Sequence, residues 1–254
     1  MKDIGGDELS GHSKWHNIAR KKGVVDQQRA KVFTKFAREM AVVIRNSGSA
    51  DPSVNGKLRD VIAKAKANNV PNDNINRVLQ KYASGGAGED YESITYEGYG
   101  PKGIAVIVET LTDNRNRTAG DMRHYFDKYG GNLGASGCVS WQFDRKGMLV
   151  VERLDDMDED EVMMQALEAG ASDFSAEEDV FEITTTPDDL GSVREKLEEN
   201  GFTFLEAEEA MVPQTYISLD DEDDIKNMNK LLEMLEDNDD VQNVWHNWEN
   251  PTEA

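Results

Sequence analysis

The chain has a single cysteine, Cys138, among its 254 residues, so it cannot form an intrachain disulfide or a cysteine-ligated metal cluster. It also lacks an apolar run of about 18 residues, the length that a membrane-spanning helix needs. Its first nine residues have no apolar core like that of a secretory signal. These absences exclude disulfide-stapled scaffolds and helical membrane proteins, and they predict a cytoplasmic protein without a membrane partner.

The spacings that mark common catalytic and cofactor sites are also missing. The four histidines show no HExxH-like spacing, and the glycines at 130, 131 and 134 lack the strand and helix context of a nucleotide-binding loop. The acidic run 220–224 lacks the alternating ligands of an EF-hand and is better explained as favourable charge at a helix start. We therefore expect no catalytic residue, no metal, no cofactor and no enzymatic activity. An RNA-processing enzyme would need a metal or nucleophile that the sequence does not reveal.

Positive charge is scarce in the whole chain, which carries a net charge of −22, but it is abundant in the first third. Residues 1–82 hold 16 Lys and Arg against 8 Asp and Glu, a net charge of +8, whereas residues 83–254 hold 12 against 42, a net charge of −30. DNA or RNA would be attracted to the first part and repelled by the second. This asymmetry predicts that one end of the chain binds nucleic acid.

The periodicity of the basic third predicts three helices. In the first, residues 26–46, apolar residues share one face and cations another, the latter being Lys31, Lys35, Arg38 and Arg45. The second is expected to begin with Asp51 as N-cap and Pro52 as first residue, and the third to end near Tyr82. The glycine-rich segment 84–88 is typical of a linker.

Beyond the linker the pattern becomes mixed α and β, so we predict the α+β class. Strands are expected at 91–99 and 103–111, the second apolar on both faces and therefore central in its sheet. Thr118–Asp121 resembles a capping box that opens a helix, and Arg145-Lys146-Gly147 resembles a hairpin turn. Further elements are expected, in order, as a helix near 158–169, a strand at 180–185, a helix at 186–200, a strand at 202–207, and a strand–helix–strand unit at 215–248.

The candidate nucleic-acid contacts are the cations and one indole of the basic third. Lysine and arginine neutralise phosphates, and an indole can stack on an unpaired base. An alternative for the indole is that it anchors the core of the helical bundle. The predicted contacts are Lys14, Trp15, Arg20, Lys21, Lys22, Arg29, Lys31, Lys35 and Arg38.

A second candidate site is the polar segment between the apolar strand and the following helix, formed by Asp113, Asn114, Arg115, Asn116, Arg117 and Thr118. Amide groups at a helix N-terminus attract anions, and two arginines would strengthen that attraction. The competing interpretation is that Asp113 pairs with Arg115 or Arg117 and fixes the loop at a domain interface.

Several motifs together resemble the YebC/PmpR family, whose members are bacterial transcriptional regulatory proteins and mitochondrial translational activators. The motifs, over residues 10–250, are Gly11–Ile18, Phe33–Lys35, Asp51-Pro52, Lys64–Ala67, Tyr96–Pro101, Leu111–Thr118 and Gly130–Gly134. The resemblance implies an N-terminal basic helical domain, of the three-helix type, and two small α/β sandwich domains, the second inserted in the first. The corresponding boundaries are 10–83, then 89–133 plus 211–250, then 134–210.

The charge pattern and the resemblance together predict a non-enzymatic, nucleic-acid-binding regulator of gene expression, a DNA-binding transcriptional regulator. The alternative is a ribosome-associated translation factor that contacts rRNA or tRNA, because basic ribosomal proteins would tolerate the acidic part of the chain. An acidic protein-binding scaffold is a further alternative. It predicts that partner binding survives deletion of residues 1–82.

Overall fold

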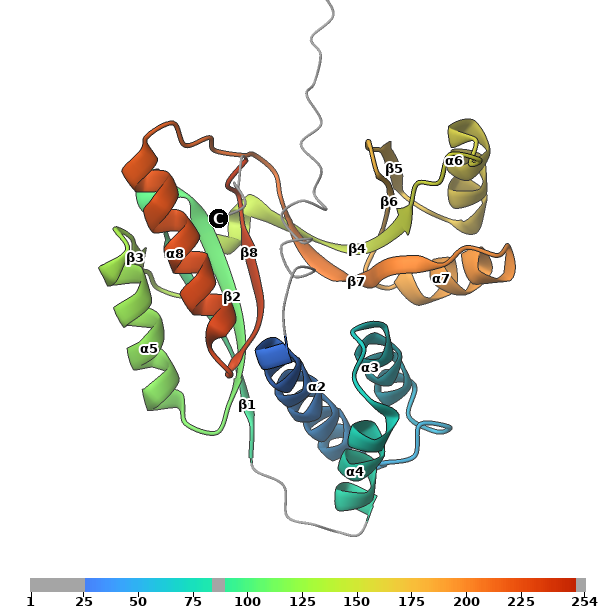
Figure 1. Cartoon of the computed structure of the whole chain (residues 1–254), viewed down its shortest axis with the longest axis horizontal. Helices are drawn as coiled ribbons and strands as arrows, with labels where there is room; N and C mark the ends of the chain where they lie inside the picture. The colour runs from blue at the N-terminus through green and yellow to red at the C-terminus, as the bar shows by residue number, and fades with distance from the viewer. Residues whose placement is uncertain (1–25, 84–89, 250–254) are drawn as a thin grey trace, which may run out of the picture. The chain divides into compact units, whose positions relative to one another are not determined.

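A computed structural model of the chain describes residues 26–83 and 90–249 (Figure 1). The described residues form two compact units, one within Arg145–Ala210 and the other within Lys21–Asp144 and Met211–Ala254. The finer division into three domains stays a prediction. The mixture of a helical N-terminal region with two four-stranded sheets confirms the α+β class.

The helical region consists of α2 (Asp26–Ser47), α3 (Gly56–Ala67) and α4 (Asn72–Ala83). Apolar residues from all three helices form one core, in which Met40, Leu58 and Ala65 are fully buried. The apolar face predicted for residues 26–46 is the face that α2 directs into this core. Burial of these residues leaves the cations of each helix on its other faces.

The start of the second helix was predicted four residues too early. Asp51 is not the N-cap but accepts a hydrogen bond from the Ser53 amide, 2.9 Å away, in a turn before the helix. The N-cap is Asn55, whose Oδ1 accepts from the Leu58 amide at 3.1 Å. Asn55 is also buried and donates to Ser47 Oγ at 2.6 Å, so its side chain joins the helix start to the end of α2. This tertiary contact decides which of two good capping residues is used.

The first sheet lies within the larger unit and has the order β3-β1-β2-β8, with neighbours antiparallel. Its strands are β1 (Glu92–Tyr99), β2 (Ala105–Thr112), β3 (Asn132–Leu133) and β8 (Val241–His246). The chain leaves this sheet after β3 and returns to it with β8, its last strand. Strand β8, which lies in the strand–helix–strand unit expected at 215–248, therefore pairs with β2.

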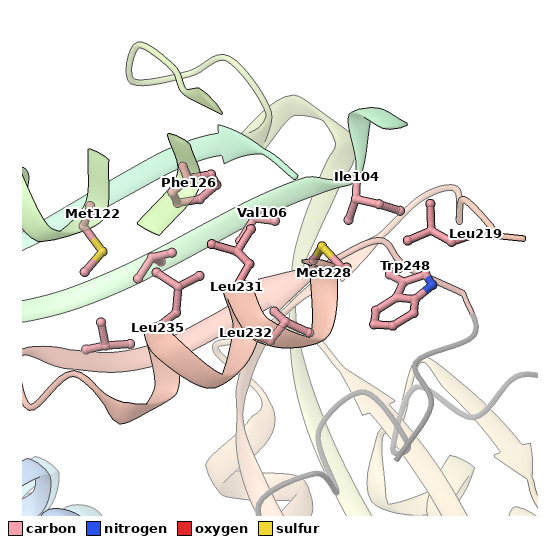
Figure 2. Packing of buried hydrophobic residues seen from close by; sticks show 12 residues of the cluster. Ile104, Val106, Met122, Phe126, Leu219, Met228, Leu231, Leu232, Leu235 and Trp248 are labelled. Carbon is pink, nitrogen blue, oxygen red and sulfur yellow. The ribbon is translucent and has the colours of Figure 1, made fainter. Parts of the chain in front are cut away.

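Strand β2 is buried on both faces, as its apolar sequence predicts. Val106 and Val108 face a core made with α5 (Arg115–Lys128) and α8 (Glu222–Asp237), which includes the buried indole of Trp248 (Figure 2). Ala105 and Ile107 face the opposite way, against a smaller cluster that contains Val139, Phe143 and Trp245. Successive residues of a strand point to opposite faces, so this sheet needs apolar cover on both sides.

Two glycines permit a close approach between β1, β3 and α5. A Cβ atom on Gly98 would lie 2.7 Å from both the Phe126 ring and the Asn132 carbonyl oxygen. A Cβ atom on Gly131 would collide with the Tyr99 carbonyl oxygen. The glycine-rich motifs at 98–100 and 130–134 therefore serve backbone packing in the first sheet.

The second sheet has the order β5-β6-β4-β7. Its strands are β4 (Phe143–Glu152), β5 (Asp173–Ala176), β6 (Val180–Thr185) and β7 (Phe204–Pro213). The helices α6 (Glu159–Ala169) and α7 (Leu190–Glu199) pack on it through a core that includes Val162, Phe181 and Leu197. Short 3₁₀ turns at Pro101–Gly103 and Ser140–Gln142 complete the described elements.

Two local predictions, the capping box at 118–121 and the hairpin turn at 145–147, were wrong. Helix α5 begins at Arg115, with Asn114 as N-cap, so Thr118 lies inside the helix and its hydroxyl is used elsewhere. The predicted hairpin turn at 145–147 is instead part of the continuous strand β4. Gly147 pairs with Thr185 there, and a Cβ atom on it would collide with the Thr185 hydroxyl. The glycine thus marks a tight contact rather than a turn.

The strand predicted at 215–219 is reduced to one isolated bridge between Ile217 and Trp248.

Candidate nucleic-acid interface and the Asp240 cluster

Five of the predicted nucleic-acid contacts, Lys14, Trp15, Arg20, Lys21 and Lys22, lie outside the described residues. Arg29 lies in α2, but the structure does not describe its side chain. The described members of the set are Lys31, Lys35 and Arg38, all on α2. The contribution of these three residues to nucleic-acid binding stays a prediction.

The cationic stripe of α2 contacts acceptors from the α/β part of the same compact unit. Lys31 Nζ lies 2.9 Å from Asp237 Oδ1, and Lys35 Nζ donates to the Glu236 carbonyl at 3.1 Å. Arg45 Nη1 lies 2.7 Å from Asp90 Oδ1. The Lys31 and Arg45 pairs are solvent-exposed, and such pairs typically contribute at most about 1 kcal/mol.

Arg38 makes the most buried of these contacts. Its Nη1 lies 2.6 Å from Asp240 Oδ1 and also donates to the carbonyls of Leu111 and Asp239. The guanidinium carbon is 5.2 Å from the centre of the Tyr91 ring. The Arg38 side chain is 14% exposed and that of Asp240 only 4%, so this ion pair is shielded from water. Both charges depend on each other, because neither is well solvated.

Asp240 is the centre of a cluster that joins four elements. Besides Arg38 from α2, its carboxylate accepts from Arg117 Nη2 at 2.8 Å and from the Thr118 hydroxyl at 2.7 Å, both on α5. The Thr112 hydroxyl at the end of β2 lies 3.2 Å from the same carboxylate. Asp240 itself directly precedes β8, and its carbonyl accepts from the Leu111 amide at 2.7 Å. Side-chain donors from α2, α5 and the end of β2 thus converge on one buried carboxylate.

The charge state of the cluster follows from these contacts. Burial alone would raise the pKa of the Asp240 carboxyl, but hydrogen bonds from Arg117, Thr118 and Arg38 outweigh burial and hold that pKa below its usual value. Hydrogen bonds to Asp240 and Asp113 raise the pKa of the Arg117 guanidinium. The cluster is therefore ionised throughout the physiological pH range.

The polar loop predicted as an anion site supplies part of this cluster. Arg117 pairs with Asp113 at 2.8 Å as well as with Asp240, and the Asn114 side chain caps α5 by accepting from the Arg117 amide at 3.1 Å. Arg115 Nη1 lies 3.0 Å from Glu92 Oε1 at the surface. The pairing of Asp113 with Arg117 is the structural alternative that the sequence left open. Asn116 is exposed, and binding of an external anion by this loop stays a prediction.

A second buried carboxylate, Glu97, was not singled out by the sequence. It is 5% exposed and accepts from the backbone amides of Gly137, Val139 and Ser140 at 2.8–2.9 Å. Burial raises the pKa of this carboxyl, but the three amides outweigh burial and lower it overall. Glu97 thereby fixes the loop before β4. The only signal in the sequence was an acid within the aromatic and glycine-rich motif Tyr96–Pro101.

Within residues 26–83 and 90–249, no group of three or more His, Cys, Asp or Glu side chains is arranged to hold a metal ion. Among the same residues, no helix combines the length and apolarity needed to cross a bilayer.

Comparison with known proteins identifies the family. Residues 13–85 match the TACO1/YebC protein N-terminal domain, and residues 91–248 match the TACO1/YebC second and third domain. A relative from Clostridium novyi named probable transcriptional regulatory protein is 60% identical over 245 residues, which cover 96% of this chain and 99% of the relative. One of the same name from Acetivibrio thermocellus is 57% identical over 240 residues, covering 94% and 99%.

A solved structure supports the same relationship. The crystal structure of a conserved hypothetical protein, Aq1575, from Aquifex aeolicus superposes with a TM-score of 0.82 at 44% sequence identity, covering 95% of this chain and 98% of that one. These relatives match this chain over nearly its whole length and over nearly their own whole length. The chain belongs to the TACO1/YebC family, the family of YebC/PmpR regulatory proteins.

Proposed function

We propose that the protein is a non-enzymatic, cytoplasmic regulator of transcription that binds duplex DNA through its basic N-terminal region. The observation that carries the proposal is the net charge of +8 on residues 1–82 in a chain whose remainder carries −30. Solubility does not require a basic region in so acidic a protein, so a polyanionic partner explains it better. The names of the relatives support the regulatory role.

The proposal rests mainly on the predicted cations outside the described contacts of α2. Lys31, Lys35 and Arg38 contact acceptors at 236–240, so we assign the main phosphate contacts to the remaining predicted cations. These are Lys14, Arg20, Lys21, Lys22 and Arg29. Arginine and lysine side chains contribute to phosphate binding mainly through counterion release.

The salt dependence of DNA binding tests this assignment. If five cations each neutralise one phosphate, the logarithm of the association constant should fall with the logarithm of salt concentration at a slope of about −4.5 or steeper. In the variant Lys21→Glu plus Lys22→Glu, that slope should be shallower by about 2. Fluorescence anisotropy of a labelled duplex measures both. The control is Arg123→Glu plus Lys128→Glu on α5, with the same change in net charge and both positions exposed. Absence of binding at low salt would eliminate the DNA assignment.

A ribosome-associated translation factor is the second candidate, and the acidic part of the chain favours it. A body with a net charge of −30 is repelled by a bare duplex, whereas basic ribosomal proteins would attract it. If this candidate is right, the protein co-sediments with purified ribosomes, and Lys21→Glu plus Lys22→Glu abolishes the co-sedimentation. Retention of the double variant on ribosomes would count against it.

A further inference from the structure

The docking of α2 leaves another helix as the exposed cationic surface of the helical region. All four cations of α2 from Lys31 onward contact acceptors at 90–91, 111 or 236–240. On α3, in contrast, Lys57, Arg59 and Lys66 are exposed. These three residues were not among the predicted contacts. Helix α3 is therefore the better placed of the two to meet a polyanion from solution.

The cations of α3 lie on both flanks of a narrow outward face. Leu58, Val61 and Ala65 define the buried side of the helix. At 3.6 residues per turn, Gly56 and Ala63 fall on the opposite side, where both are exposed. Lys57 falls on one flank between these sides, and Arg59 and Lys66 fall on the other. Asp60 also falls on the outward side, and Arg59 Nη2 lies 3.7 Å from where a Cβ atom on Gly56 would be, so a partner that approaches α3 meets charged side chains first.

This arrangement fits the major groove of B-form DNA. The groove is about 12 Å wide and admits one α-helix, and a phosphate backbone borders it on each side. A helix with cations on both flanks directs charge towards both backbones. Arg59 and Lys66 are seven residues apart, about 10 Å along the helix axis, and so would contact separate phosphates. The major groove of A-form RNA is too narrow for such an entry.

We propose that α3 enters the major groove of duplex DNA, with Lys57 on one bordering backbone and Arg59 and Lys66 on the other. The inference rests on the proposed DNA binding and adds to the cations at 14–29 an element that enters the groove.

The test compares two triple variants of the full-length chain. Lys57→Gln, Arg59→Gln and Lys66→Gln remove the flanking charges of α3, whereas Arg123→Gln, Lys128→Gln and Lys226→Gln remove three exposed charges from α5 and α8. The α3 variant should bind duplex DNA at least about tenfold more weakly at 100 mM salt, with a salt slope shallower by about 2.7. The α5/α8 variant should bind like wild type. Circular dichroism and thermal melting should show both variants folded, because all six side chains are exposed.

A second readout separates groove entry from contact with the backbone alone. Methylation of guanine N7 places a methyl group in the major groove, so it should interfere with binding of the wild-type protein at two or more neighbouring positions. Absence of interference would overturn the proposal, as would an α3 variant that binds like wild type. The proposal would also be overturned if the α3 variant lost as much affinity for an RNA hairpin as for the DNA duplex, each compared with wild type. If wild type binds no duplex at all, the proposed function itself fails. If it binds and only the variant at 21 and 22 is weakened, the assignment to α3 alone fails.

Discussion

Replacing Asp240 with alanine is expected to lower the free energy of unfolding of the larger unit by about 3 kcal/mol or more. The substitution leaves Arg38, 14% exposed, without its carboxylate partner and removes one of the acceptors near the Thr118 hydroxyl. A buried cation without its partner is costly because water cannot replace the lost charge. Trp245 and Trp248 belong to the same unit, so urea unfolding followed by tryptophan fluorescence reports on it.

Asp239→Ala is the matched control for this prediction. Asp239 is the preceding residue and is exposed, so loss of its side chain should change the free energy of unfolding by no more than about 0.5 kcal/mol. The contact between its carbonyl and Arg38 would remain, since it involves the backbone. Similar destabilisation by both substitutions would show that the turn before β8, rather than the buried charge, accounts for the effect.

The same cluster predicts a dependence of stability on pH. The pKa of Asp240 is lower in the folded protein than in the unfolded chain, where an aspartate titrates near about 3.9. Its stabilisation is thus complete above the unfolded pKa and is lost as pH falls through the folded pKa. The difference in unfolding free energy between wild type and Asp240→Asn should be constant from pH 7 to 5 and narrow below about pH 4. A constant difference down to pH 2 would contradict the ionised cluster.

The sequence predicts local structure well where one periodicity dominates. The apolar face of α2 and the doubly buried strand β2 follow directly from residue spacing, because burial imposes a period on apolar residues. The cationic stripe of α2 was also visible, but spacing shows only that its members share a face. It does not show whether their partner is a phosphate or a carboxylate some 200 residues further along the same chain.

Asp240, the carboxylate that pairs with Arg38, could not be identified from the sequence, and there are two reasons. Residues 148–254 contain 33 acids, and nothing local distinguishes Asp240 from its exposed neighbour Asp239. What distinguishes it is the convergence of α2, α5 and the end of β2 on one point, which only the tertiary fold provides. The turn predicted at Gly147 failed for a similar reason, since the need for glycine came from the Thr185 side chain on another strand.

Replacing Glu97 with alanine is expected to destabilise the first sheet by about 3 kcal/mol, because three backbone amides lose their acceptor together. The Val139 amide is buried, so water cannot reach it without opening the loop. Glu97→Gln should recover only part of this loss, since its amide oxygen can accept from Val139 and Ser140 but its amide nitrogen would face the Gly137 N–H. The local effect should appear as faster hydrogen exchange at the amides of Gly137, Val139 and Ser140.

Glu92→Ala provides the comparison for Glu97 on the same strand. Glu92 pairs with Arg115 at the surface, where their side chains are 52% and 67% exposed, so its loss should cost less than about 1 kcal/mol. Two glutamates five residues apart on β1 thus differ several-fold in expected effect, although each makes contacts at 2.8–3.0 Å. Burial rather than distance sets the difference, because only the buried donors lack water as a substitute. Equal effects of the two substitutions, or unchanged exchange at the three amides, would contradict this account of the loop.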